Sequence, residues 1–183
     1  LMTSKEKLIE LLLTKPKSKL ITPLINEVES LSKINLQCDA ELLKGVWELK
    51  WSSSTQPWLK QAQWLENLQV LDPIQKKGMN LLRLSGPIGA LAVIAVEAEL
   101  SINGENQVGV KFKKGGWIGP SVRNGWRPKL LKNINQSFPA WLDITALDES
   151  LRICRGNAGT CFALLKRHDL SVCDWIPPSV EQN

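Results

Sequence analysis

The hydrophobic pattern of the chain changes its period at Gly45, and this change limits the folds that the chain can adopt. Before Gly45, leucines and isoleucines recur at helical spacing. Directly after it, Trp47, Leu49 and Trp51 alternate with polar residues in the run GVWELKW. Alternation with a period of two is typical of a strand that is buried on one face. The sequence therefore predicts helices first and a sheet afterwards.

Two or three helices are expected within residues 1–44. Thr3 and Glu6 have the spacing of a capping box, so a first helix is expected to start there. A second helix is expected at Thr22, which suits the N-cap and is followed by a proline that suits the first helical position. A short third helix is possible over 39–44.

The rest of the chain is predicted to form short antiparallel strands. Asn103-Gly104 is a strong hairpin signal, and residues 156–159 form another. Many short strands with close turns and no helices between them favour a barrel or a sandwich. The strands expected after the first span 69–71, 79–84, 90–102, 107–113, 140–145, 150–156 and 160–167.

The positive charge of the chain comes from one segment. Residues 110–132 hold seven of the 23 lysines and arginines and none of the 18 acidic residues, so the remainder has a net charge of −2. A strand is expected up to residue 113, with Phe112 facing inward, followed by a loop of Gly/Pro turns. Cations beside tryptophans suit an anionic membrane surface, and a solvated loop with a tryptophan folded over the barrel mouth is the alternative. The candidate membrane-contact residues are Lys113, Lys114, Trp117, Arg123, Trp126 and Arg127.

A second hairpin is expected within residues 147–167. Centred on Asn157-Ala158, its strands pair Cys154 with Cys161 and place Arg152, Cys154, Cys161 and Ala163 on one face. The two thiols would then be within bridging distance, and reduced thiols are expected.

Arg152 on a half-buried face of this hairpin needs a partner. The options are Asp148, Glu149, a backbone carbonyl or the ring of Trp47 through a cation–π contact. Two roles stay open, an arginine that closes the barrel and an arginine that binds a ligand head group.

Two stretches resemble one family. FPAWLDITALDESLRICRGNAGTCFALLKR (138–167) resembles the C-terminal signature of the plastid lipid-associated protein/fibrillin (plastoglobulin) family, and LLKGVWELKWSSS (42–54) is similar to its N-terminal motif. The chain departs from the family at Trp51 and Ala146, where tyrosine is frequent, and at Asn157, where aspartate is frequent. The matching residues of the C-terminal signature are Trp141, Leu142, Asp143, Leu147, Asp148, Glu149, Leu151, Arg152, Ile153, Arg155, Gly156, Gly159, Phe162 and Leu164.

The resemblance implies a mainly β fold, a lipocalin-like antiparallel β-barrel preceded by two or three N-terminal helices. The expected organisation is helices packed on the barrel (1–44), the barrel (45–176) and a tail (177–183). An eight-stranded barrel is just wide enough for side chains or one small ligand, so a filled barrel is the alternative to a cavity. The expected ligand-binding residues of the interior are Trp47, Leu49, Trp51, Ile94, Arg152 and Cys154.

The resemblance also implies non-enzymatic binding of an apolar lipid or isoprenoid, such as a quinone or a carotenoid, at thylakoid membranes or lipid globules. The alternative is a structural coat or scaffold protein at lipid bodies or membranes with no internal ligand. We expect the chain at the thylakoid periphery or in the cytoplasm of a cyanobacterium, or in a plastid, because it shows neither a signal peptide nor a transit peptide.

Other function classes have weak support in the sequence. Four cysteines without a CxxC spacing and a single histidine argue against a zinc site. His168 lies among charged residues, and no nucleophile or nucleotide motif accompanies it, so we expect neither an enzyme nor a cofactor. A nucleic-acid partner is not expected either, because Trp117 and Trp126 are placed in turns, a poor geometry for stacking on bases.

Overall fold

The computed structural model describes residues 2–54, 64–86, 89, 93–122 and 126–178. Three helices come first, as predicted, and they are α1 (Ser4–Thr14), α2 (Ile21–Leu31) and α3 (Leu36–Leu43). The predicted N-cap at Thr22 is wrong, because α2 begins at Ile21 with Leu20 at the N-cap, and α3 begins three residues earlier than expected. The capping box of Thr3 and Glu6 is present at the start of α1. The strands are β1 (Gly45–Ser52), β2 (Leu65–Asp72), β3 (Lys77–Leu84), β4 (Val93–Asn103), β5 (Gln107–Ile118), β6 (Lys129–Asn133), β7 (Ala140–Leu147), β8 (Leu151–Gly156) and β9 (Cys161–Lys166).

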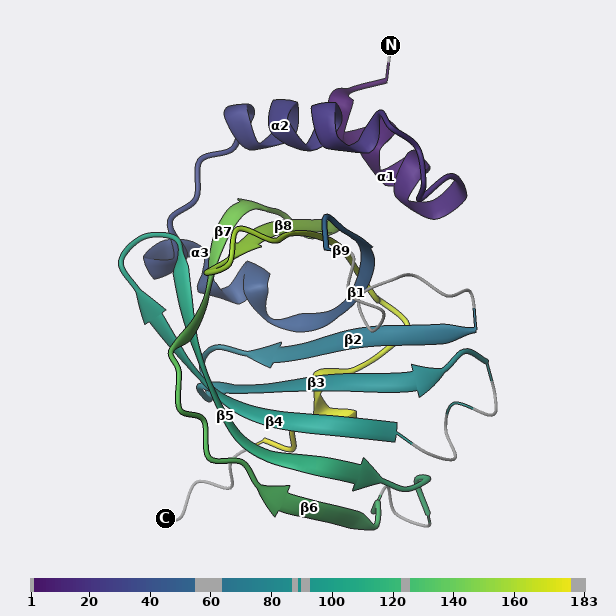
Figure 1. The fold of residues 1–183 in the computed structure, drawn as a ribbon, viewed down its shortest axis with the longest axis vertical. Coiled ribbons are helices and arrows are strands. Elements are labelled where there is room, and N and C mark those ends of the chain that lie inside the picture. The colour runs from purple at the N-terminus through teal and green to yellow at the C-terminus, as the bar shows by residue number, and fades with distance from the viewer. Residues whose placement is uncertain (1, 55–63, 87–88, 90–92, 123–125, 179–183) are drawn as a thin grey trace.

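The strands form one antiparallel sheet that closes into a ring. The order is β4-β3-β2-β1-β9-β8-β7-β5-β6, and a further pairing of β4 with β5 completes the barrel. Eight strands therefore make the ring, while β6 extends it along the second half of β5. The predicted fold class, a mainly β antiparallel barrel preceded by helices, is confirmed (Figure 1).

The helices cover the barrel in two places. In Figure 1, α1 and α2 lie as a layer above β7, β8 and β9, and their apolar side chains pack on the outer face of these strands. Glu29 of α2 fixes this layer, because its carboxylate accepts hydrogen bonds from Arg155 at 2.6 and 2.9 Å and from Thr145 at 2.7 Å. The third helix contributes Leu36 and Leu43 to the core inside one end of the barrel.

The N-terminal helix is tied to the barrel by an ion pair whose strength depends on pH. The Nζ atom of Lys5 lies 2.9 Å from Asp148 Oδ2. Burial acts to raise the pKa of Asp148, but hydrogen bonds from Lys5, Ser150 and Leu151 outweigh it and lower the pKa to about 2. A carboxylate with a depressed folded-state pKa stabilises the fold above its unfolded-state pKa, and this contribution is lost as the pH falls through the folded-state value.

We therefore expect Asp148→Asn to be less stable than the wild type at pH 6, and the difference to shrink at pH 2.5. Urea unfolding midpoints at the two pH values measure this. Asp39→Asn is the control, since Asp39 is half-buried in the first turn of α3 and forms no ion pair with another described residue. An equal deficit of Asp148→Asn at both pH values would show that its charge is not the cause.

The prediction for residues 114–118 is wrong, because they form a strand and not a loop, and β6 was not predicted at all. The glycines of this segment indicate turns when the sequence is considered alone. Instead they allow close strand contact, since a Cβ atom at Gly116 would lie 2.1 Å from the carbonyl oxygen of Leu130 in β6. β4 offers backbone partners along all of β5, with one irregularity between Glu97 and Ala98.

The register of the β8–β9 hairpin differs from the prediction by one residue. Cys154 pairs with Phe162, and Cys161 pairs with Arg155. The turn contains Gly159 at φ +77°, a left-handed conformation that suits a three-residue connection and not the two-residue turn that was assumed. A slip of one residue moves every side chain of one strand to the other face. Cys161 and Ala163 therefore face the helices, and the two cysteines lie on opposite faces as free thiols.

Candidate functional site: the barrel cavity

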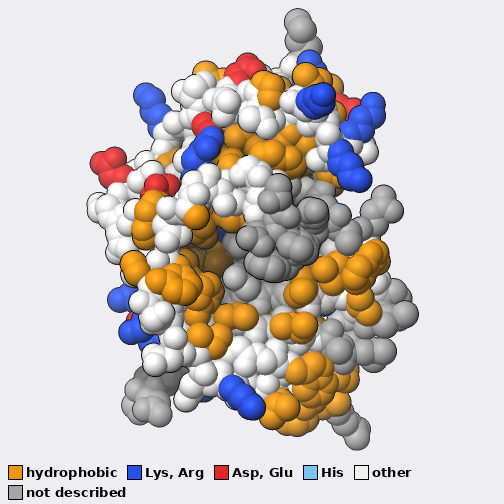
Figure 2. Space-filling model, viewed as in Figure 1, with side chains coloured by type: hydrophobic (Ala, Val, Ile, Leu, Met, Phe, Trp, Pro, Cys, Tyr) orange, Lys and Arg blue, Asp and Glu red, His pale blue; other side chains and the backbone are white. Residues whose placement is uncertain are grey.

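The interior of the barrel is not completely filled. It contains a cavity of about 520 Å³ between the two ends of the ring. This volume lies in the range of small-molecule sites, which are mostly apolar with a few polar groups. Figure 2 shows hydrophobic side chains around a hollow on the face in view. The apolar lining includes Leu49, Leu71, Leu82, Val96, Leu100, Val108, Val110, Phe112, Leu142, Ile144 and Phe162.

Trp47 closes one end of the interior. Its side chain is fully buried in the cluster that contains Leu36 and Leu43 of α3. The indole Nε1 donates a hydrogen bond to the carbonyl oxygen of Leu43 at 2.9 Å. The first strand therefore brings its tryptophan under α3, because β1 starts two residues after that helix ends.

Arg152 lies beside this tryptophan. Its guanidinium carbon is 5.2 Å from the centroid of the Trp47 ring, so of the predicted partners the cation–π contact is confirmed. Nη2 donates to Oε1 of Gln69, while Nε has no hydrogen-bond partner among the described residues. Burial lowers the pKa of Arg152, yet a guanidinium stays protonated in proteins. Asp148, another predicted partner, pairs with Lys5 instead.

The six predicted interior residues fall into three groups. Leu49, Ile94 and Arg152 line the cavity, with Ile94 at its exposed end. Trp47 and Cys154 lie in the apolar cluster at its base, where burial raises the pKa of the Cys154 thiol. The prediction for Trp51 is wrong, because the pairing of β1 with β9 shifts between Leu49 and Trp51. Trp51 therefore packs against the cluster beneath α1 and α2.

The polar part of the lining was missed by sequence reasoning. Asn67 and Gln69 of β2 and Asn80 of β3 face the cavity, whereas Leu68 and Val70 face outward. Alternation along β2 was visible in the sequence, but the apolar face of a strand is expected to point inward. Here it points outward because the C-terminal segment covers it with Trp175 and Ile176, both buried.

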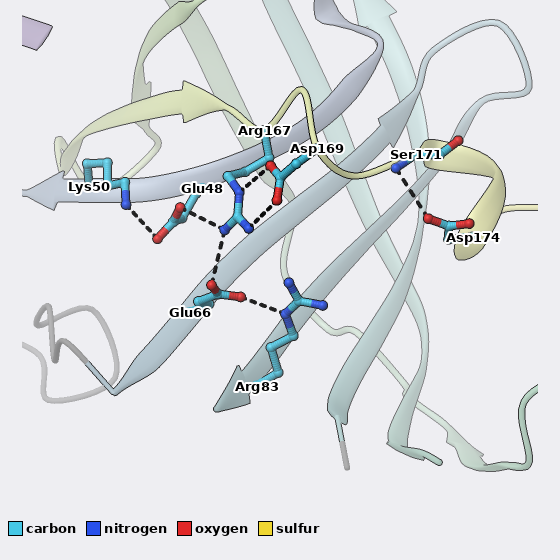
Figure 3. A network of polar contacts seen from close by, with 8 residues as sticks. All are labelled: Glu48, Lys50, Glu66, Arg83, Arg167, Asp169, Ser171 and Asp174. Atoms are coloured by element: carbon cyan, nitrogen blue, oxygen red, sulfur yellow. Dashed lines mark hydrogen bonds and ion pairs between the residues drawn. The ribbon is translucent and has the colours of Figure 1, made fainter. Parts of the chain in front are cut away.

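A network of charges holds the segment after β9 on the outside of the barrel (Figure 3). Arg167 Nη1 lies 3.1 Å from both Glu48 of β1 and Glu66 of β2, and its Nη2 lies 2.7 Å from Asp169. Arg83 of β3 donates to Glu66 at 2.6 Å. These ion pairs join β1, β2 and β3 to the C-terminal segment on the outer face of the barrel. The uncharged amides of β2 and β3 lie on the inner face.

An exposed apolar rim lies at the far end of β4, β5 and β6 from α3. We use the term rim for Ile94, Trp117 and Leu130, which lie side by side because Ile94 pairs with Trp117 and Trp117 with Leu130. Ile94 and Leu130 are 60% and 67% exposed. Ile94 lines both the cavity and the shallow groove of the rim, so the two apolar surfaces are continuous.

The predicted membrane-contact residues that the structure describes do not form one surface. Lys113 Nζ lies 2.6 Å from Glu99, and Lys114 pairs across the sheet with Glu97, on the face opposite to Trp117. Arg127 is held over the ring of Trp175 at 4.4 Å, which assigns it a packing role. The acidic residues of β4 thus neutralise part of the positive charge of residues 110–132.

The remaining three predicted membrane-contact residues, Trp117, Trp126 and Arg123, have different outcomes. Trp126 lies outside the strands, as predicted, and its side chain is exposed, whereas Trp117 lies on a strand and not in a turn. The argument against nucleic acid that used its position in a turn therefore fails for Trp117. Arg123 lies outside the described residues.

The described residues contain no group of three or more His, Cys, Asp or Glu side chains placed to hold a metal ion. His168 is exposed, as expected for a lone histidine among charges. Within the same part of the chain, no helix has the length and hydrophobicity needed to cross a membrane.

Comparison with known proteins gives one match. The family model PAP_fibrillin matches residues 5–165, from α1 into β9. No curated protein and no solved structure matches the chain.

Proposed function

The chain belongs to the PAP_fibrillin family of lipid-associated proteins, and on this basis we propose that it binds an apolar lipid or isoprenoid in the barrel. The observation that carries the proposal is the cavity of about 520 Å³, with its mostly apolar lining. Burial of apolar surface contributes about 25 cal/mol per Å², so such a cavity favours hydrocarbon. A quinone or a carotenoid is a ligand of this class, and binding involves no reaction.

We further propose that the protein works at the surface of thylakoid membranes or lipid globules. The continuous apolar surface from the rim to the cavity supports this, because a ligand can pass from a bilayer into the barrel without crossing water. Exposed apolar patches mark interaction sites, and tryptophan is enriched at membrane interfaces. In this proposal the rim, and not the paired lysines of β5, is the principal contact with lipid.

The test of ligand binding is extraction of the purified protein with organic solvent, followed by mass spectrometry. We expect an apolar lipid in near-stoichiometric amount. If no lipid is extracted and none binds on addition, while the protein still binds liposomes, the coat or scaffold alternative is correct and internal binding is wrong.

The test of the rim is liposome flotation of the double variant Trp117→Thr/Leu130→Thr. Both sites are on strands, and threonine retains strand preference while removing apolar area. Because each large apolar side chain contributes about 1.5–3 kcal/mol on full burial, we expect membrane partitioning to fall on the order of tenfold. The matched control is Lys113→Gln/Lys114→Gln, which should change partitioning much less because of Glu97 and Glu99. If the control lost more membrane partitioning than the rim variant, the lysines of β5 and not the rim would be the principal contact with lipid.

A further inference from the structure

Arg152 is the one ionisable side chain among the described residues that line the cavity. It is fully buried, and no described carboxylate lies within ion-pair distance of it. Its only hydrogen-bonded side-chain oxygen is the neutral amide oxygen of Gln69, and its Nε is unpartnered in the described structure. A permanent positive charge therefore borders an apolar cavity without a negative charge to balance it.

Such an arrangement is unfavourable without a bound anion. A buried charge costs several kcal/mol unless it is paired and hydrogen-bonded. The ring of Trp47 compensates part of this cost through its cation–π contact. It does so from one side only, and a ring supplies no hydrogen-bond acceptor in the plane of the guanidinium, where the N–H groups point.

We propose that Arg152 binds the head group of the ligand and that the ligand is a single-chain lipid ending in a carboxylate. This rests on the proposed function of the same cavity. One negative charge balances the one positive charge, and a planar carboxylate fits the planar fork of a guanidinium. The amides of Asn67, Gln69 and Asn80 line the same cavity. The hydrocarbon chain then runs along the apolar lining toward Ile94 and the rim, so the lipid enters with its head first.

The test compares two ligands that share one hydrocarbon chain, a fluorescent polyene fatty acid and its methyl ester, at neutral pH. A hydrogen bond to a charged group contributes about 1.5–3 kcal/mol, so the wild type should bind the acid at least about tenfold more tightly than the ester. In Arg152→Met, which keeps an apolar side chain of similar length, the acid should bind no more tightly than the ester.

The matched control is Lys166→Met. Lys166 Nζ also lies 5.2 Å from the Trp47 ring, but its amine donates to the carbonyl oxygen of Leu42 and does not line the cavity. This variant loses a cation over the same ring and should keep the preference of the wild type for the acid. Loss of the preference in both variants would attribute it to general electrostatics near Trp47 and overturn the role of Arg152.

The comparison within the wild type decides the proposal even if Arg152→Met fails to fold. Equal binding of acid and ester overturns the head-group assignment and leaves the proposed apolar cavity intact. Binding of neither ligand, with no lipid recovered by extraction, overturns the proposed function itself.

Discussion

Trp47→Ala is expected to lower the free energy of unfolding by about 3–5 kcal/mol, the range for removing a large aromatic side chain from a core. The indole is fully buried between α3 and the barrel interior, and its Nε1 bonds to the carbonyl oxygen of Leu43. The variant leaves a void at the closed end of the barrel and removes the ring that faces Arg152. Equilibrium unfolding in urea measures the effect.

Trp64→Ala is the matched control, because Trp64 is 64% exposed next to the start of β2. Surface substitutions of this kind stay within about 0.5 kcal/mol. Trp47→Phe separates ring volume from the hydrogen bond, and we expect an intermediate loss. If Trp47→Ala were as stable as Trp64→Ala, the barrel would not depend on α3 and Trp47 for its closed end.

Local signals in the sequence predicted much of the fold. The capping box at Thr3 and Glu6 fixes the start of α1 through contacts within four residues. The change of period at Gly45 marks the first residue of β1, and Asn103-Gly104 lies between β4 and β5. These features depend on short-range geometry, which the order of residues specifies directly.

Features set by distant partners were not predictable in the same way. The run Gly115-Gly116 is equally compatible with a turn and with close strand pairing, and the positions of β4 and β6 on its two sides select the strand. The face of Cys161 depends on whether the turn has two or three residues, a difference of one position that reverses the whole strand.

The candidate site shows the same limit. Arg152 and Cys154 were assigned to the interior because alternation along β8 is regular. Trp51 was misassigned because a bulge interrupts the alternation, and a bulge has no clear sequence signal here. Gln69 and its neighbouring amides were missed because the C-terminal segment covers the other face of β2, over a hundred residues away in the sequence.

A pair of adjacent leucines tests whether the N-terminal helices belong to the folding unit of the barrel. Leu12 and Leu13 of α1 differ in environment, with 2% and 59% of their surfaces exposed. Leu12 packs in the cluster that joins α1 and α2 to β7, β8 and β9, so Leu12→Ala should lower the free energy of unfolding by about 2–5 kcal/mol. Leu13→Ala makes the same chemical change one residue away, and it should stay within about 0.5 kcal/mol.

The shape of the unfolding curve distinguishes two ways in which Leu12→Ala can act. If the helices and the barrel fold together, circular dichroism and tryptophan fluorescence should report one coincident transition at lower urea. If α1 and α2 detach first, the helical signal and the fluorescence of Trp51, which packs against the same cluster, should change at lower urea than the fluorescence of the buried Trp47, so two transitions should be seen. We expect the coincident transition, because Ala163 and Ile153 of the barrel wall are buried in the same cluster as Leu12. Detachment of α1 and α2 would expose these apolar side chains of the barrel wall to water. The helices and the barrel are therefore expected to unfold as one unit.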